Sequence, residues 1–148
     1  MSAALFVAAV MTAVIGCGGS SADTSHFVGM WKWDTGVINA DCGALSVPPQ
    51  DLTGQTLTLV KGGGGEVVAT LTATCQITFT VSGDTATANP GQMCKLMVGT
   101  TNQTLAISSW TLTTADGASM MADMKGTALA GACTVTGNGM LSKQAAAP

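Results

Sequence analysis

The sequence predicts an all-β domain of about eight antiparallel strands arranged as a meander. From residue 27 onward, apolar side chains recur at every second position over much of the chain, which is the period of a strand. Glycine-rich turn signals separate these segments, as they do in β-hairpins. Gly, Ala and Thr dominate the composition and only 4% of the residues are aromatic, which favours strands over helices. We favour closure into a barrel, with two packed sheets as the alternative.

The first residues of the chain are typical of an export signal. Residues 3–15 form an uncharged apolar run that has the length of a signal-peptide core and is too short to span a bilayer comfortably. The run ends in Val14-Ile15-Gly16-Cys17, which resembles the lipobox of bacterial lipoproteins. This resemblance implies removal of residues 1–16, attachment of diacylglycerol to the Cys17 thiol and, often, acylation of the freed amine by a chain such as palmitate.

Residues 17–25 are expected to tether the domain to a membrane. The stretch from Gly18 to Ser25 is polar and rich in Gly and Ser, which is the composition of a flexible linker. Two or more acyl chains hold a protein stably on a bilayer, so the lipid on Cys17 is a sufficient anchor. Gly18 at the second mature position resembles lipoproteins forwarded to the outer membrane. We therefore expect an exported protein, lipid-anchored to the cell envelope at the outer membrane.

The predicted β domain covers residues 26–143 and begins with a strand. One face of this strand carries Phe27, Gly29, Trp31 and Trp33. Residues 37–54 contain the pair Pro48-Pro49, and because proline resists incorporation into a sheet interior, we expect a long loop there. Alternation and strand length then predict strands over residues 55–61, 66–71, 75–81 and 85–88. Turns are expected at residues 62–65, 72–74 and 82–84.

The rest of the domain is expected to contain three more strands. Residues 92–102, which include Cys94, are interpreted as a second loop. Further strands are expected over residues 104–114 and 118–129 and from Cys133 onward, with a frayed tail over residues 144–148. Within the first of these strands, the apolar phase changes between Ile107 and Trp110. This change predicts a β-bulge near Ser108-Ser109.

Four cysteines remain after Cys17 is assigned to the lipid. They are Cys42, Cys75, Cys94 and Cys133. An even number of cysteines in an exported chain predicts disulfides, here two, and four cysteines allow three connectivities. We favour Cys75 with Cys94, and Cys42 with Cys133. Because the sequence has no C-x-x-C pair, a metal site is the weaker interpretation.

The composition excludes several kinds of function. Charged residues make up 9% of the chain, arginine is absent and the net charge is -3, so a basic surface for nucleic acid cannot form. The only histidine, His26, lies next to the tether. Most of the carboxylates fall at turns or on solvent faces, and Asp is an ordinary turn residue. We therefore expect no enzyme activity, no catalytic residue and no cofactor.

The segment Phe27-Val28-Gly29-Met30-Trp31 contains a G-x-W motif and resembles the first strand of lipocalins. Together with the strands that follow, residues 26–143 look like the small lipocalin-like lipoproteins of myxobacteria. The resemblance implies a barrel with one end closed by the tryptophan. The chain departs from the lipocalin pattern, because it lacks the T-D-x-R type motif and the basic residue of the last strand that caps the tryptophan. Lys143 is only a loose substitute for that residue.

The aromatic residues suggest where a ligand site would lie. The candidate lining residues for a pocket are Phe27, Trp31, Trp33 and Trp110. The alternative is that these rings form a filled core. The first functional hypothesis is thus a lipid-anchored envelope protein that binds a small apolar ligand. The second is a structural or protein-interaction module at the cell surface.

Copper binding is a third and weaker hypothesis. Met120, Met121 and Met124 lie close together in the sequence, and thioethers are ligands for Cu(I). In a strand, however, Met121 faces away from the other two. We therefore favour methionine as a filler of the core over methionine as a metal ligand.

Overall fold

The computed structural model describes residues 22–98 and 101–145. The predicted signal peptide, the lipidation site Cys17 and the first part of the tether lie outside these ranges, as do residues 146–148 of the predicted tail. Among the residues that are described, no helix is long and apolar enough to cross a membrane.

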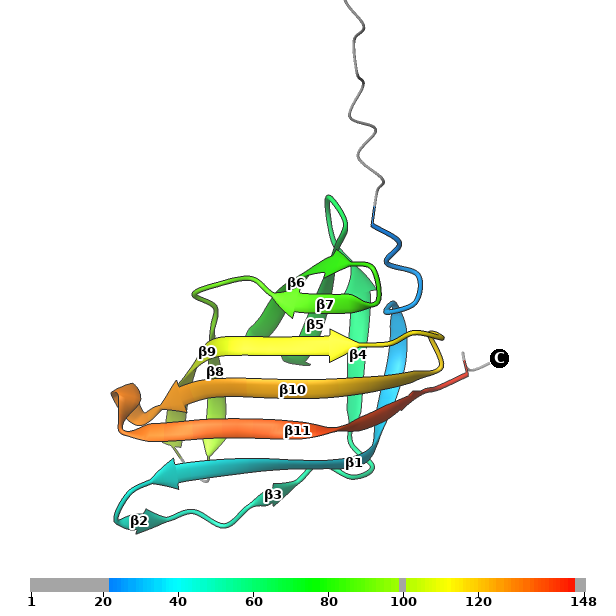
Figure 1. The fold of residues 1–148 in the computed structure, drawn as a ribbon. Helices are drawn as coiled ribbons and strands as arrows, with labels where there is room; N and C mark the ends of the chain where they lie inside the picture. Colours follow the sequence, from blue (N-terminus) through cyan, green and yellow to red (C-terminus); the bar gives the residue numbers. More distant parts are fainter. Residues whose placement is uncertain (1–21, 99–100, 146–148) are drawn as a thin grey trace, which may run out of the picture.

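Eight antiparallel strands close into a barrel as a meander, which confirms the predicted fold (Figure 1). Each strand of the ring pairs with the next one along the chain, and the last strand pairs with the first. The ring consists of β1 (Gly29–Cys42), β4 (Thr56–Lys61), β5 (Glu66–Thr72), β6 (Cys75–Ser82), β7 (Thr85–Ala88), β9 (Thr101–Thr113), β10 (Ser119–Ala128) and β11 (Cys133–Lys143). Closure leaves no free edge in the ring.

Three short strands and a single helical turn complete the described chain. They are β2 (Leu45–Ser46), β3 (Gln50–Asp51), β8 (Met93–Val98) and the 3-10 turn η1 (Leu129–Gly131). Both β2 and β3 fold back onto β1, while β8 pairs with β9. The loop predicted over residues 37–54 is therefore wrong over much of its length, because β1 continues to Cys42 along β11. The second predicted loop is also wrong where β8 forms.

The apolar alternation decides which side chains enter the barrel. In β11 the inward positions are buried and alternate with exposed neighbours from Cys133 to Asn138, as the two-residue period predicts. In β9 the register with β10 shifts between Lys125 and Gly126, which pair with Ser109 and Ile107. Ser108 is thus the extra residue of a bulge, as predicted. The bulge turns Trp110 to the inside of the barrel, where only 4% of its surface is exposed.

One end of the barrel, here called the capped end, is covered by the residues that precede β1. The carbonyl of Thr24 accepts hydrogen bonds from the backbone N–H groups of Phe27 and Val28, both at 3.1 Å. The Thr24 side chain is buried, and Ala22 packs against the core. The contacts of the barrel thus begin four residues before the expected boundary at His26, within the segment that the sequence predicted as a tether.

Lys143 closes the capped end over Trp31. Its Nζ lies 5.4 Å from the centre of the Trp31 ring and donates to the carbonyls of Ser25 and His26 at 3.3 and 3.4 Å. The Trp31 indole N–H donates to the Phe27 carbonyl at 2.7 Å. Lys143, which the sequence analysis treated only as a loose substitute for a capping basic residue, therefore does lie over the tryptophan. The next residue also contradicts the predicted frayed tail, because the Gln144 backbone N–H donates to the Met30 carbonyl at 2.8 Å.

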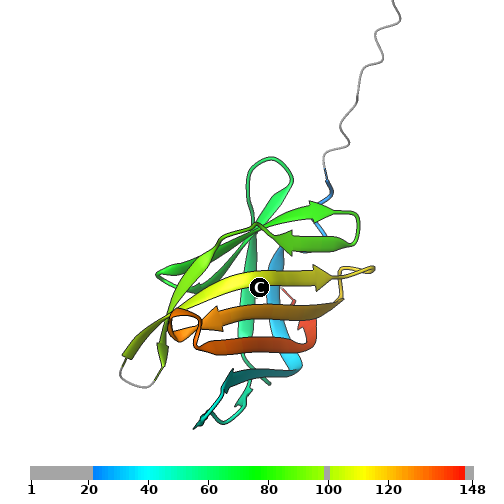
Figure 2. The ribbon, with the colours of Figure 1, turned by 60° about the vertical axis from the view of Figure 1, so that its left-hand side comes forward.

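Two disulfides hold the opposite end, here called the open end. Cys42 is bonded to Cys133 and Cys75 to Cys94, which confirms the favoured pairing. The first bond joins the end of β1 to the start of β11, and the second joins β6 to β8. Disulfides persist in oxidising compartments, so the protein belongs to an exported environment. Figures 1 and 2 show that the chain enters the barrel at the end opposite to β2 and β3.

Candidate ligand pocket

The size of the inward side chains changes along the barrel axis. Large side chains fill the capped half and are fully buried there, among them Phe27, Trp31, Leu112, Met120 and Leu141. Nearer the open end, several inward positions of β1, β10 and β11 hold small residues, namely Ala40, Ala122, Ala128 and Gly137. An eight-stranded barrel is just wide enough for side chains to fill it or for one small ligand. The capped half is therefore a packed core, and the open half contains a cavity.

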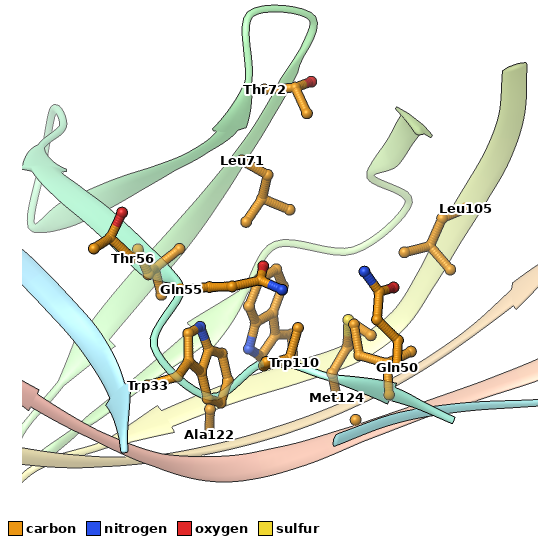
Figure 3. A pocket seen from close by; sticks show the side chains of 14 residues that line it. Trp33, Gln50, Gln55, Thr56, Leu71, Thr72, Leu105, Trp110, Ala122 and Met124 are labelled. Carbon is orange, nitrogen blue, oxygen red and sulfur yellow. The ribbon is translucent and has the colours of Figure 1, made fainter. Parts of the chain in front are cut away.

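The first cavity has a volume of about 370 Å³ and lies inside the open half (Figure 3). Its wall is formed by residues of β1, β3, β4, β5, β9, β10 and β11 and of the segment between β3 and β4. The apolar residues at its base include Trp33, Trp110, Ala122 and Met124, while Gln50, Gln55, Thr56 and Thr72 contribute polar groups around it. Its volume lies within the range of about 300–1,000 Å³ that is usual for small-molecule sites.

A second cavity of about 500 Å³ adjoins the first one. The two cavities share the lining residues Ile38, Gln50, Leu105 and Met124. The second cavity extends to the disulfide Cys42–Cys133 and to Val47 and Pro48, which lie between β2 and β3.

A strap, defined here as residues 43–55, forms one side of both cavities. It is held to β1 by backbone hydrogen bonds, from the Leu52 N–H to the Gly36 carbonyl at 2.9 Å and from the Gly54 N–H to the Trp33 carbonyl at 2.8 Å. Within the strap, the Asp51 carboxylate accepts from the Thr53 N–H at 2.8 Å. These hydrogen bonds with Thr53 lower the pKa of Asp51 below its ordinary value. The proline pair lies in this segment, where no ladder hydrogen bond is required of it.

Trp33 lies against two glycines of neighbouring strands. A Cβ atom at Gly36 would be 2.7 Å from the Trp33 ring, and one at Gly139 would be 2.9 Å from it. The backbones of β1 and β11 thus approach the indole closely only because both positions lack side chains. This contact fixes the ring as part of the cavity wall.

Trp110 carries a buried hydrogen-bond donor without a partner. Its ring packs edge-on against Phe79, with the ring centres 5.3 Å apart and an angle of 74° between the planes. Its Nε1 is the one buried side-chain nitrogen or oxygen that lacks a partner among the described residues. Buried polar groups nearly always have a partner, so each exception requires an explanation.

Charged side chains do not line either cavity. In the described parts of the chain, the carboxylates whose pKa is lowered are Asp23, Asp51 and Asp116, and the hydrogen bonds responsible come from residues next to them in sequence. Asp116 lies in the turn between β9 and β10, as predicted, whereas Asp51 is the last residue of the short strand β3. His26 is exposed at the capped end, away from the cavities, and residues 22–98 and 101–145 contain no group of three or more His, Cys, Asp or Glu placed to hold a metal ion.

The structure divides the four predicted pocket residues into two pairs. Trp33 and Trp110 line the first cavity. Phe27 and Trp31 are completely buried in the core of the capped half instead. Phe27 was expected in the first strand but lies in the turn before β1, and Trp31 lies near the start of β1 at the capped end. The methionines divide as the strand phase predicts, since Met120 and Met124 point inward whereas Met121 is 55% exposed.

Sequence reasoning missed most of the wall. The strap residues Gln50 and Leu52 fall in a segment for which the sequence predicted no role, and nothing in the sequence pattern singled out Leu105, Met124 or Gly137 as site residues. The small inward residues of the last two strands were a usable signal, because small side chains on neighbouring strands at one level leave space between them. No protein-family model matches this chain, and a search of the curated proteins finds no match either.

Proposed function

We propose that this protein binds a small apolar molecule inside the open half of its barrel and that lipid on Cys17 anchors it to the cell envelope. The observation that carries the proposal is the pair of adjoining cavities, lined by apolar side chains and uncharged polar ones. Burial of apolar ligand surface is worth about 25 cal/mol per Å². The mechanism is enclosure, with no bond made or broken.

The cavities favour ligand binding over a purely structural role. A barrel that serves only as a scaffold is expected to fill its interior, since each void removes packing contacts and destabilises the fold. Here the capped half is filled and the open half is not. Val47, which lines the second cavity and is exposed, is consistent with a route by which an apolar molecule enters.

The position of the N-terminus determines how an anchored barrel would face. Cys17 precedes Ala22 by five residues, a distance of at most about 18 Å in extended chain. Because Ala22 packs at the capped end, a lipid on Cys17 would hold that end toward the membrane. The open end and its cavities would then face away from the membrane, toward the aqueous side.

The proposal has two parts that are tested separately. For the anchor, the full chain is expressed in a bacterium that is fed an alkyne-labelled palmitate. We expect label on the wild type and none on Cys17→Ser, with the wild type in the membrane fraction. An unlabelled wild-type protein would exclude the anchor.

For the pocket, residues 18–148 are exported to a periplasm and purified without detergent. This segment contains every described element of the barrel. Native mass spectrometry is expected to show an apolar adduct that organic solvent extracts. A bare chain that also takes up no apolar probe, such as 2-isopropenylnaphthalene, would exclude ligand binding and favour an interaction module. A copper adduct would instead revive metal binding through methionine.

A further inference from the structure

We infer that the pocket selects neutral ligands that carry a hydrogen-bond acceptor, such as a ketone, ester or alcohol oxygen, and that Trp110 Nε1 donates to this acceptor. The inference rests on the proposed ligand-binding function. It names the class of molecule and the group that recognises it.

The first argument is the unpaired donor itself. Trp110 is 4% exposed and lines the first cavity, and its Nε1 has no partner among the described residues. By contrast, the equally buried Trp31 in the capped half donates to the Phe27 carbonyl at 2.7 Å. The core thus satisfies the indole N–H of Trp31 and leaves without a partner the buried N–H of Trp110, whose ring lines the cavity. An acceptor on a bound molecule would remove this penalty.

The second argument is the way in which the chain places Trp110. Without the bulge at Ser108, the residues of β9 that follow Ile107 would keep its phase, and Trp110 would face outward. A Cβ at Gly126, the residue of β10 opposite the bulge, would be 2.5 Å from the Ala106 carbonyl oxygen, so the bulge also requires glycine there. The backbone irregularity of β9 therefore serves to bring one donor-bearing ring to the cavity.

The third argument concerns charge. The cavity wall has no Lys or His, and the chain has no Arg. A carboxylate buried beside Trp110 would lose its hydration without gaining a counter-ion, which is strongly unfavourable. An uncharged oxygen loses less hydration and gains the indole hydrogen bond. Neutral acceptors are thus favoured over both anions and pure hydrocarbons.

The test uses three probes of nearly the same shape. They are 2-acetylnaphthalene with a carbonyl, 2-isopropenylnaphthalene with a methylene in place of the oxygen, and 2-naphthoate with a charged carboxylate. Their dissociation constants are measured by equilibrium dialysis for the wild type, Trp110→Phe and Trp33→Phe, all as residues 18–148. Trp33→Phe is the matched control, because it makes the same reduction in side-chain size in the same cavity wall and leaves the proposed donor of Trp110 in place.

We expect the ratio of the isopropenyl to the acetyl dissociation constant to be about threefold to tenfold higher in the wild type than in Trp110→Phe. Trp33→Phe should weaken both probes in the same proportion and keep the wild-type ratio. An unchanged ratio in Trp110→Phe, or naphthoate that binds as tightly as the ketone, would overturn the inference while the pocket stands. If none of the probes binds, the proposed function itself fails.

A measurement on the unmutated protein guards against a variant that does not fold. In ¹⁵N-labelled wild type, the indole N–H proton of Trp110 is expected to move downfield on addition of 2-acetylnaphthalene and not with the isopropenyl isostere. The indole N–H of Trp31 is the internal reference, because its bond to Phe27 does not change. Equal movement of the Trp110 signal with both probes would contradict a hydrogen bond to the ligand.

Discussion

The ammonium of Lys143 lies 5.4 Å from the centre of the Trp31 ring, and the two residues are register partners across β1 and β11. The contact joins the last strand of the barrel to the first one at the capped end. It also ties both strands to the residues before β1, because the same ammonium donates to the carbonyls of Ser25 and His26. One side chain thus connects the β1–β11 pair, which closes the ring, to the residues that cover the capped end.

We predict that Lys143→Met lowers the free energy of unfolding by about 1 kcal/mol, since a partly exposed cation over an indole contributes about that much. Lys143→Arg should retain most of the stability. Urea unfolding monitored by tryptophan fluorescence measures both variants. Lys125→Met, at an exposed position of β10, is the control. Equal losses for the variants at positions 143 and 125 would show that the contact with Trp31 does not stabilise the barrel.

Gly29 is required beside this contact for two reasons. Its φ of +143° is a conformation that side chains disfavour, and a Cβ there would lie 2.8 Å from Lys143 Cε. We predict that Gly29→Ala destabilises the protein by about 1–3 kcal/mol. Gly63→Ala is the matched control, since a Cβ at that position would have no neighbour within 4 Å, and it should unfold at the wild-type urea concentration. A wild-type midpoint for Gly29→Ala would contradict this account.

The two disulfides should differ in their contribution to stability. Cys42 and Cys133 are 91 residues apart, whereas Cys75 and Cys94 are 19 apart. In the chain-entropy model the longer loop is worth about 4.6 kcal/mol and the shorter about 3.2 kcal/mol. Thermal unfolding of the two double Cys→Ala variants is expected to follow that order. The reverse order would mean that packing at the buried pair Cys75 and Cys94 outweighs chain entropy.

The strand pattern predicted the barrel well because alternation is a local property. The burial pattern of β6 alternates along its whole length, and the bulge of β9 could be placed because Ile107 and Trp110 differ in phase. The continuation of β1 beyond Trp33 was missed, because the pairing that stabilises it is with β11, about a hundred positions away in sequence. A register with a distant strand leaves no local signal in the residues that adopt it.

The candidate site was predicted only in part for a related reason. Trp33 and Trp110 could be proposed as wall residues because a large aromatic side chain in a small domain belongs either to the packed core or to a binding site. Whether an aromatic residue belongs to the core or to the site depends on its position along the barrel axis. This position is set by the tilt and register of all eight strands. Phe27 and Trp31 therefore could not be separated from Trp33 by strand phase alone.

The turn between β9 and β10 should make stability depend on acidity. The Asp116 carboxylate accepts from the backbone N–H groups of Ser119 and Ala118, and these bonds lower its pKa below the ordinary value of 3.8. Because the folded-state pKa is depressed, this contribution is complete above pH 3.8 and is lost as the pH falls through the folded value. Asp116→Ala should thus destabilise the protein at pH 7 more than in strong acid. Urea titrations at several pH values test this, and a pH-independent loss would contradict it.

Gly137 offers a way to close the pocket without damaging the barrel. A Cβ there would lie 3.3 Å from Met124 Cε, the end of a flexible side chain, and at an ordinary contact distance of 3.4 Å from Ile38 Cγ1. Both residues belong to the shared wall of the cavities. At Gly126 of the adjacent strand β10, by contrast, a Cβ would meet the Ala106 carbonyl. The backbone cannot move away there without loss of the bulge.

We therefore predict opposite outcomes for two substitutions on neighbouring strands. Gly137→Ala should keep the wild-type stability or raise it by about 0.5–1 kcal/mol, because alanine restricts the unfolded chain more than glycine does. It should also weaken binding of an apolar probe, since the new methyl takes up cavity space. Gly126→Ala should lower stability. Urea unfolding and equilibrium dialysis measure both effects. If Gly137→Ala bound the probe as tightly as the wild type, the ligand would have to occupy a different part of the barrel.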